Sequence, residues 1–417
     1  MALRPEESVI CGQGKRQLSL TEALAIIRRE LQPCADRQRL SLTAALGRVL
    51  AKPVHATLDV PGHDNSAMDG YAVRHADLQT GQPLRVIGSA FAGRVFSGTV
   101  APGQCVRIMT GAVVPDGADT VVMQEQVRRE GDLVWVDGQH VPGSYIRRRG
   151  EDLRAGDLVL PAGHRLGPAD LGLLASLGIA EVDVRRPLRV AILSTGDELR
   201  LPGETLAPGQ IYDSNRYTLH GMLQRYGAEV LDFGVVPDQP ERLHQALRQA
   251  SAAADVVITS GGVSVGEADY ITSLLAEHGS IGFWRLHTRP GRPLAFGRMG
   301  SAVFFGLPGN PVSVMVTFYQ IVMPALECLE GKTPTPRLQL RARLERPIVK
   351  RDPRLEFQRG VMTVSSDGTI TVRPTGNQSS GVLRSMSEAN CFIVLPEGAY
   401  ELQPQDWVNI EPLVGFN

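Results

Sequence analysis

Apolar residues recur with three different spacings along the chain, and each spacing predicts a different kind of folding unit. Near the start, the capping-box sequence Ser19–Glu22 precedes apolar residues at helical spacing over 23–31, which predicts a helix. A second short helix is predicted over 42–50. Between residues 56 and 145, short apolar runs alternate with Gly and Pro turns, a pattern typical of a small β-rich unit.

From about residue 187, short apolar strands alternate with stretches of helical spacing, a pattern that favours a doubly wound parallel sheet. The predicted strands are 189–193, 229–233, 256–258 and 303–305, and the predicted helices are 217–226, 239–253 and 313–329. The Thr-Pro repeat at 333–336 is typical of a linker, and the strand-like runs after it predict a separate small β domain.

The chain is therefore predicted to be a multidomain protein of α/β and β units, which agrees with ~150 residues per domain. The predicted division is a mixed N-terminal and linking domain (17–55 and 147–186, with a helix over 168–177), a β-rich domain (56–146), a central α/β domain (187–332) and a C-terminal β domain (337–417).

Composition excludes several classes of protein. Of the 417 residues, 43% are hydrophobic and 21% are charged, so the chain is not largely disordered. The 43 Lys and Arg against 44 Asp and Glu give a net charge of −1 and no global positive field, so no nucleic-acid partner is expected. No uninterrupted apolar run reaches ~18 residues, so no membrane partner is expected. The five cysteines form no C-x-x-C pair and the nine histidines lack metal-ligand spacing, which favours a reducing cytoplasm.

Small and polar residues follow three of the predicted strands in the central unit, at 194–198, 260–264 and 306–311. In open α/β sheets, ligands bind outside the carboxyl ends of the strands, and Gly lets the backbone approach an anion there. The alternative is that these glycines only close tight turns. None of the three turns is a P-loop or a G-x-G-x-x-G sequence, so an ordinary nucleotide-binding motif is not predicted.

Carboxylates lie in or beside these turns, at Asp197, Glu198, Asp238, Glu267 and Asp269. Such oxygen ligands suit Mg²⁺ that bridges to a phosphate. For Asp197 and Glu198 the alternative is an acidic first turn of a helix, which the helix dipole favours.

Two arginines flank a stiff turn in the sequence Arg289-Pro-Gly-Arg292. A tetrahedral oxyanion would be bound by such a pair through charge-assisted hydrogen bonds, whereas the alternative is a solvated surface turn. The charge run Arg147–Arg149 is interpreted as a solvated or domain-bridging face.

Four motifs together resemble one known family, the molybdopterin molybdenumtransferases (MoeA), which is related to the E domain of gephyrin. The motifs are Asp64-Asn-Ser-Ala-Met-Asp-Gly-Tyr-Ala72, Ser194-Thr-Gly-Asp-Glu-Leu199, Ser260-Gly-Gly-Val-Ser264 with Asp269, and Leu307-Pro-Gly-Asn-Pro-Val-Ser313. The resemblance extends from about Leu18 to Pro412, and the four motifs in this order are highly specific, although each alone would be weak.

The resemblance implies an elongated four-domain subunit that forms a homodimer. Its α/β domain would be similar to molybdopterin adenylyltransferases, and its C-terminal domain would be a small β-barrel. The active cleft would form between the β-rich domain of one subunit and the last two domains of the other. The implied reaction takes adenylylated molybdopterin and molybdate, releases AMP and leaves molybdenum on the dithiolene, with Mg²⁺ as the divalent cation. A molybdopterin adenylyltransferase and downstream cofactor-delivery proteins would be partners.

The resemblance also assigns residues by motif position. Asp69 and Thr110 would line the cleft, and Asp152 matches a motif position whose role is open. The residues facing the pyrophosphate would be Glu198, Asp238, Ser264 and Asp269, with Asp238 and Asp269 as metal ligands. The residues binding molybdate would be Arg289, Arg292, Arg359 and Ser380, with Pro308 and Pro311 shaping the loop. The family often has Lys where this chain has Arg285, Arg289 and Arg292, so the charge is retained here with a planar donor geometry.

Two other functions remain open at the level of sequence. A molybdopterin adenylyltransferase would share the α/β domain, but that activity would not need residues 56–146 or 337–417. A scaffold or receptor-binding protein of the gephyrin E-domain type is the other alternative, and the absence of a fused adenylyltransferase domain argues against it.

Overall fold

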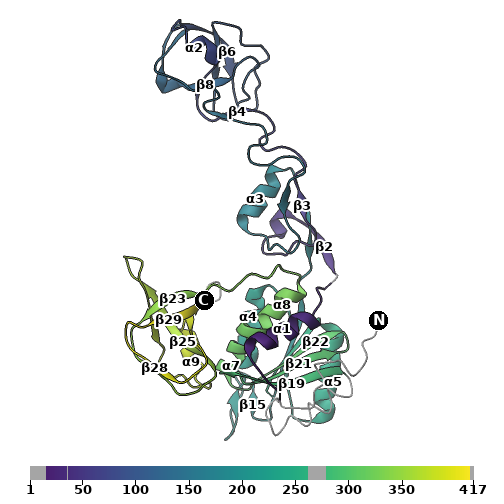
Figure 1. The fold of residues 1–417 in the computed structure, drawn as a ribbon. Helices are drawn as coiled ribbons and strands as arrows, with labels where there is room; N and C mark the ends of the chain where they lie inside the picture. Colours follow the sequence, from purple (N-terminus) through teal and green to yellow (C-terminus); the bar gives the residue numbers. More distant parts are fainter. Residues whose placement is uncertain (1–15, 35, 262–278, 414–417) are drawn as a thin grey trace. The chain divides into compact units, whose positions relative to one another are not determined.

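The computed structural model describes residues 16–34, 36–261 and 279–413. The chain forms two compact units, shown in Figure 1. The large unit comprises the chain up to Gln38, Gly47–Val49 and everything from Arg185 onward, and the inserted unit comprises Arg39–Leu46 and Leu50–Val184. The boundaries of the four predicted domains stay a prediction.

A seven-stranded sheet forms the centre of the large unit, in the order β1-β19-β21-β22-β18-β14-β17. In chain order these strands are β1 (Arg16–Leu18), β14 (Arg189–Thr195), β17 (Glu229–Val236), β18 (Val256–Ser260), β19 (Gly279–Leu286), β21 (Pro293–Met299) and β22 (Ala302–Leu307). Every residue of β18 and β22 is buried, as expected for strands covered on both faces. The predicted α/β class is confirmed.

One strand departs from the predicted parallel arrangement. Strand β21 runs antiparallel to both β19 and β22. The reason is the two-residue turn at Gly300 and Ser301, where Gly300 has a φ of 57°. So short a connection can only join antiparallel strands, because a parallel pair needs a crossover.

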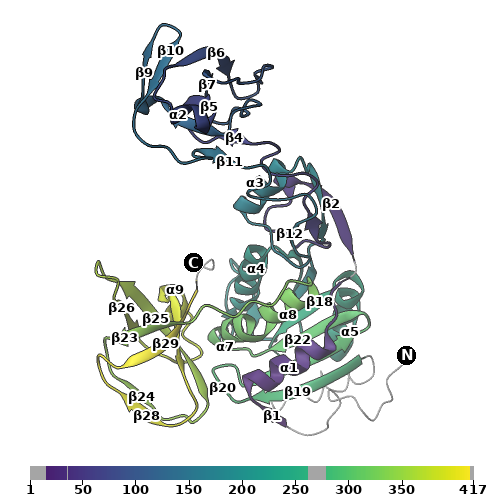
Figure 2. The same ribbon diagram turned by 45° about the horizontal axis from the view of Figure 1, so that its top comes forward.

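Helices cover both faces of this sheet, which makes it doubly wound. They are α1 (Leu20–Glu30), α4 (Asn215–Tyr226), α5 (Pro240–Ala253), α7 (Pro311–Thr317) and α8 (Met323–Leu329), with the π-helical turn η4 (Phe318–Val322) joining the last two. One hydrophobic core unites α1, α4, α7 and α8 with one face of the sheet, and a smaller core places Leu243, Leu247 and Ala250 of α5 on the other. Figure 2 shows α1, α4 and α7 gathered beside the sheet.

The predicted capping box at the start of α1 is present. Ser19 Oγ accepts from the backbone N–H of Glu22 at 3.2 Å, and Glu22 Oε2 accepts from the Ser19 backbone N–H at 2.8 Å. Replacing Ser19 with Ala removes one of these bonds, so Ser19→Ala should lower the free energy of unfolding by about 1 kcal/mol in urea denaturation. Thr21→Ala, at an exposed position in the same turn, is the control and should change stability by less than about 0.5 kcal/mol. Equal effects of both changes would contradict the assignment.

The continuous helical segment Pro311–Leu329 is long and apolar enough to cross a membrane by length and composition, with a mean hydropathy of 1.6 in its best window. Ser313, Thr317 and Gln320 interrupt its apolar residues, so the segment contains no uninterrupted apolar run of ~18 residues. In the structure 72% of that window is buried inside the protein, which is how a core helix is packed.

The C-terminal region of the large unit is a closed five-stranded barrel, as predicted. Its strands are β23 (Leu340–Leu344), β25 (Leu355–Val364), β26 (Ile370–Pro374), β27 (Cys391–Leu395) and β29 (Trp407–Pro412). The ring closes because β25 pairs with both β26 and β27. The two-residue strand β20 (Thr288–Arg289) extends from the α/β region and pairs with β25, and the Tyr319 and Phe392 rings meet at 5.8 Å. The barrel and the α/β region therefore pack as one body.

The remaining elements of the large unit are β15 (Leu199–Arg200), β16 (Ile211–Tyr212), β24 (Ile348–Lys350), β28 (Tyr400–Leu402) and α9 (Arg384–Glu388).

The inserted unit is mainly β, with a six-stranded sheet in the order β8-β5-β7-β6-β10-β9. These strands are β5 (Gly70–Val73), β6 (Leu84–Ala90), β7 (Gln104–Ile108), β8 (Thr120–Met123), β9 (Val127–Glu130) and β10 (Leu133–Val136). Shorter strands form separate two-stranded pairs: β2 (Arg37–Ser41) with β13 (Glu181–Arg185), β3 (Val54–His55) with β12 (Leu158–Leu160), and β4 (Asn65–Ser66) with β11 (Ile146–Arg147). Its helical elements are α2 (His75–Leu78), α3 (Pro168–Ser176), η2 (Leu42–Ala44) and η3 (Gln124–Gln126).

One helix predicted in the inserted unit is confirmed and one is wrong. Helix α3 matches the prediction over 168–177. The helix predicted over 42–50 is only the single 3₁₀ turn η2, because Gly47 adopts a φ of 75° and Leu50 forms a bridge with Val184. A left-handed Gly ends a helix, so the apolar residues here are buried in turns instead.

Candidate functional site

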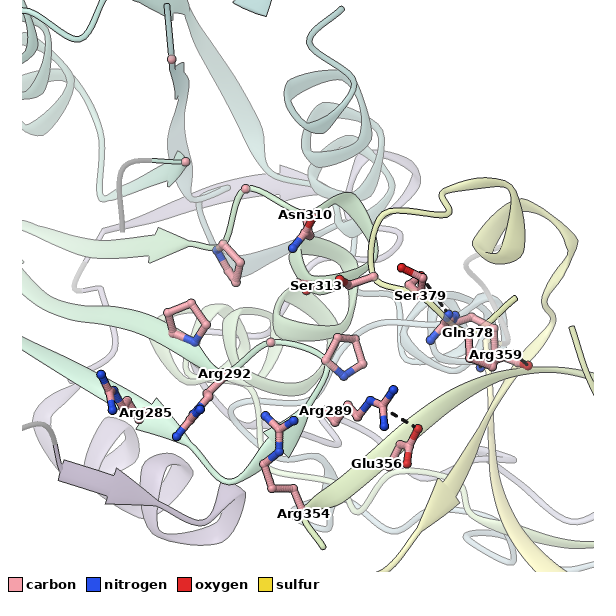
Figure 3. A pocket seen from close by; sticks show the side chains of 18 of the residues that line it. Arg285, Arg289, Arg292, Asn310, Ser313, Arg354, Glu356, Arg359, Gln378 and Ser379 are labelled. Atoms are coloured by element: carbon pink, nitrogen blue, oxygen red, sulfur yellow. Dashed lines mark hydrogen bonds and ion pairs between the residues drawn. The ribbon is translucent and has the colours of Figure 1, made fainter. Parts of the chain in front are cut away.

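A cavity of about 820 Å³ lies in the large unit, where the carboxyl ends of β14, β18 and β22 face the barrel. Figure 3 shows it from close by. From the α/β region its lining residues are Thr195, Gly196, Glu198, Asp238, Gly261, Arg285, Arg289–Pro293, Pro308–Asn310 and Ser313. From the barrel they are Arg354, Glu356, Arg359 and Asn377–Ser380.

The strand-end turns predicted from sequence meet on one side of this cavity. Thr195 Oγ1 donates a hydrogen bond to Asp238 Oδ1, and the Asp238 backbone N–H donates to Asp197 Oδ1 at 3.2 Å. Gly261 has a φ of 92°, and a Cβ there would lie 2.6 Å from the Thr195 carbonyl oxygen. Glycine is therefore required at this position by close approach of two backbones.

A side-chain amide fixes the end of β18 to the turn after β22. Asn215, the first residue of α4, donates from Nδ2 to Ser260 Oγ at 2.8 Å and to the Gly309 carbonyl oxygen at 2.7 Å. The end of β18 and the turn after β22 are thus held together before any ligand binds. Such preorganisation lowers the entropic cost of ligand binding.

The turn Arg289-Pro-Gly-Arg292 forms a cationic wall of the cavity. Gly291 has a φ of 89°, and a Cβ there would meet Thr317 Oγ1 at 2.6 Å, so the turn packs directly against α7. The Arg289 side chain is 45% exposed, and its Nε lies 3.8 Å from Glu356 Oε1. Arg292 is exposed and makes no ion pair within the part of the chain that the structure describes. Its guanidinium is available to an anion.

The barrel contributes a buried cation. Arg359 is only 1% exposed, and it donates from Nε to Ser385 Oγ at 3.1 Å and from Nη2 to the Ser379 carbonyl oxygen at 3.2 Å. Burial lowers the pKa of Arg359 to about 10, so the side chain stays positively charged at neutral pH. The Ser380 carbonyl oxygen accepts from the Val312 backbone N–H at 3.1 Å, which joins this wall to the start of α7.

Of the residues assigned through the motifs, the cavity gathers seven: Glu198, Asp238, Arg289, Arg292, Pro308, Arg359 and Ser380. Pro311 is the first residue of α7 and does not line the cavity. Ser264 and Asp269 lie outside the described residues.

Arg354 and Glu356 line the cavity and were missed from sequence. Arg354 forms a two-pronged pair with Asp352 and donates to the Thr288 carbonyl oxygen at 3.1 Å, so it fixes the residue before Arg289. Glu356 is buried, and its Oε2 has no hydrogen-bond partner among the described residues. In the sequence, the charged segment Lys350–Arg354 is the feature that could have pointed to these two residues. Nothing in that segment indicates that the following strand, β25, faces Arg289.

Three assigned residues belong to the inserted unit. Asp69 Oδ1 accepts from the Thr110 backbone N–H at 2.7 Å and from Thr110 Oγ1 at 2.8 Å. These two hydrogen bonds hold the pKa of Asp69 below its usual value, so the carboxylate is ionised at neutral pH. The structure thus brings Asp69 and Thr110 into contact, and their place in an active cleft stays a prediction. Asp152 lies elsewhere in this unit, in a second cavity of about 390 Å³.

No group of three or more His, Cys, Asp or Glu side chains that could hold a metal ion occurs within the described ranges. The cavity does offer the Glu198 and Asp238 carboxylates on neighbouring turns. Mg²⁺ in proteins is often bound by one or two carboxylates together with substrate phosphates and water. The Glu198 and Asp238 carboxylates are therefore suitable ligands for a Mg²⁺ ion that binds together with a phosphorylated ligand.

Three family descriptions match consecutive parts of the chain. Residues 18–178 match the MoeA N-terminal region (domain I and II), residues 191–328 a probable molybdopterin binding domain, and residues 341–413 the MoeA C-terminal region (domain IV).

Curated relatives match over most of the chain. A molybdopterin molybdenumtransferase of Haemophilus influenzae is 44% identical over 400 residues, covering 95% of this chain and 98% of that protein. A protein of the same name from Nostoc sp. is 41% identical, covering 87% of this chain and 86% of that protein. Gephyrin of Dictyostelium discoideum is 33% identical, covering 93% of this chain and 61% of gephyrin. Among solved structures, a molybdopterin biosynthesis moeA protein of Pyrococcus horikoshii aligns with a TM-score of 0.82 at 30% identity, covering 95% of this chain and all of that one.

The fold, with its arginine-lined cavity, is that of a multidomain protein of molybdenum cofactor biosynthesis. The chain belongs to the molybdopterin molybdenumtransferase (MoeA) family. The resemblance inferred from the four motifs is therefore confirmed.

Proposed function

We propose that this chain is a molybdopterin molybdenumtransferase, which takes adenylylated molybdopterin and molybdate, releases AMP and leaves molybdenum on the dithiolene. The observation that supports this most directly is the cavity in the large unit, which joins five arginines to two strand-end carboxylates. Two anionic substrates would be attracted to the same place by these cations.

Each wall of the cavity has a distinct task in this proposal. Arg289, Arg292 and Arg359 bind molybdate, because a dianion needs several cations and Arg359 has lost its hydration through burial. The glycine-containing turn after β14 would bind the phosphates through backbone N–H groups. Glu198 and Asp238 would hold Mg²⁺, which when bound neutralises charge on the phosphoanhydride. The enzyme's remaining contribution is to position molybdate beside the dithiolene.

The test is AMP release from adenylylated molybdopterin, measured by chromatography with and without molybdate. The proposal expects release that depends on molybdate and yields a molybdenum-loaded product. ATP with unadenylylated molybdopterin is the control, and formation of the adenylylated product there would favour an adenylyltransferase instead. Chelation of Mg²⁺ with restoration by added Mg²⁺ tests the metal requirement.

The proposal includes the setting of the reaction. A substrate that is already adenylylated requires an adenylyltransferase upstream, and a labile metal-dithiolene product requires a protein that accepts it. These partners and a cytoplasmic location belong to the proposal, as does the homodimer implied by the family resemblance.

Light scattering at micromolar concentration should give twice the 45.1 kDa mass of the chain. The reason is that the predicted cleft draws residues from two subunits, so a single chain would lack a complete site. A profile containing only the 45.1 kDa species, with activity retained, would exclude the dimer.

A further inference from the structure

Glu356 is a buried carboxylate in the barrel wall of the large unit's cavity, and the proposed function gives it no role. It is only 4% exposed, and it lies in the same strand, β25, as Arg359. Figure 3 shows it beside Arg289, on the side of the cavity where the proposed function puts the oxyanion. A carboxylate repels an anion, so its burial among the arginines needs a physical reason.

Hydrogen bonds do little to stabilise the negative charge of Glu356. Its Oε1 accepts from Gln358 Nε2 at 3.2 Å and lies 3.8 Å from Arg289 Nε, which is too long for a hydrogen bond. Its Oε2 is buried and has no hydrogen-bond partner among the residues that the structure describes. A buried carboxylate oxygen without a donor is costly while the group is ionised, so the ionised form depends on nearby positive charges.

Cations approach Glu356 from three segments of the large unit. They are Arg289 of β20, Lys350 of β24, Arg354 just before β25 and Arg359 within it. Tyr400 of β28 also lies close, but burial raises the pKa of its phenol, which is therefore neutral. A dianion that binds the arginines competes with Glu356 for their charge and adds a like charge beside it. Both effects favour the neutral carboxyl of Glu356.

A second carboxylate near Arg289 is held in its ionised form. Asp352 Oδ2 lies 3.9 Å from Arg289 Nη1. Asp352 also forms a two-pronged pair with Arg354, which holds the pKa of Asp352 well below its usual range. Asp352 therefore stays ionised when an anion approaches. Glu356 has no such pair in the described structure, so it is the carboxylate that can accept a proton.

We propose that Glu356 takes up a proton from solvent when a tetrahedral dianion binds to the arginines of this cavity, so that the site binds the anion and the proton together. The proton returns to solvent when the anion leaves, so no further reactant is needed. That the dianion is molybdate rests on the proposed function, whereas the coupling depends only on charge. Because each binding event removes a proton from solution, molybdate affinity should fall as the pH rises.

Isothermal titration calorimetry of the full-length protein with molybdate, in buffers of different ionisation enthalpy, measures this proton uptake. The wild type should take up about one proton per anion at neutral pH, and its dissociation constant should rise by roughly tenfold per pH unit above neutrality. Glu356→Gln should take up almost no proton and bind with little dependence on pH. At about pH 8.5 the variant should bind molybdate roughly tenfold more tightly than the wild type, because the amide removes the repulsion.

A purely structural role for Glu356 predicts the opposite result, since its loss would loosen Arg289 and weaken binding at every pH. Glu356→Asp retains a carboxyl group and should retain the proton uptake. Glu401→Gln, at an exposed carboxylate of β28, is the matched control and should bind as the wild type does. Wild-type binding without proton uptake would overturn the coupling. So would an unchanged pH dependence in Glu356→Gln, which would assign the titration to Lys350, whose pKa is lowered by burial.

The proton count of the wild type needs no variant, so the test holds even if thermal melting shows that Glu356→Gln is poorly folded. Molybdate-dependent AMP release without proton uptake on molybdate binding would refute the coupling and leave the proposed function standing. Proton uptake that Glu356→Gln abolishes, in a protein that releases no AMP, would support the coupling and count against the proposed function.

Discussion

Asp238→Asn is expected to slow AMP release from adenylylated molybdopterin by on the order of 10²-fold, which is typical when a metal-holding or water-orienting carboxylate is lost. Asp238 lines the cavity and accepts from Thr195 Oγ1, so its carboxylate is fixed by the end of β14. The amide retains the size and one oxygen of the side chain, so the strand-end turn should keep its shape. The same loss is expected for Asp269→Asn, whose position the structure does not describe.

The measurement is single-turnover AMP release at saturating molybdate, with thermal melting to verify the fold. Glu241→Gln is the matched control, because Glu241 lies in the first turn of α5, is exposed and does not line the cavity. Near-wild-type release in both Asp238→Asn and Asp269→Asn would place the pyrophosphate elsewhere.

Arg292→Ala is expected to raise the molybdate concentration for half-maximal activity by roughly tenfold to a hundredfold, because charge-assisted hydrogen bonds are each worth ~1.5–3 kcal/mol. Arg292 has no ion-pair partner in the described structure, so its removal leaves no buried charge behind. The effect should therefore appear in molybdate binding and not in stability. Arg292→Lys should recover part of the loss, since the charge returns without the planar donor pair.

A molybdate titration of both variants decides this prediction, with Arg248→Ala as the control. Arg248 is an exposed cation of α5 away from the cavity, so its removal tests the effect of net charge alone. If Arg292→Ala leaves the molybdate concentration for half-maximal activity unchanged, the turn at 289–292 is a solvated loop. That was the alternative interpretation of the sequence.

Local sequence patterns were sufficient for much of the fold because they report on neighbouring residues. The capping box at Ser19 and the helical spacing after it predicted α1, and Pro168 and Gly178 bracket α3. The same patterns wrongly predicted a helix over 42–50. The apolar residues there have helical spacing, but Leu50 pairs with Val184, which is far away in the chain. Local patterns likewise did not predict that β21 is antiparallel, which follows from the short turn at Gly300 that joins it to β22.

The sequence by itself determined the family, the α/β and β classes and seven of the residues around the cavity, because motifs and periodicity are properties of residues close together in the chain. Only the tertiary structure decided which of these residues meet. It brought Arg359 of the barrel to Arg289 and Arg292 by pairing β20 with β25, and it added Arg354 and Glu356 to the same wall. It also buried Arg359 and left Asn65, Arg147 and Asp152 around a second cavity. Burial and electrostatic environment depend on contacts between distant segments, and no local pattern specifies those contacts.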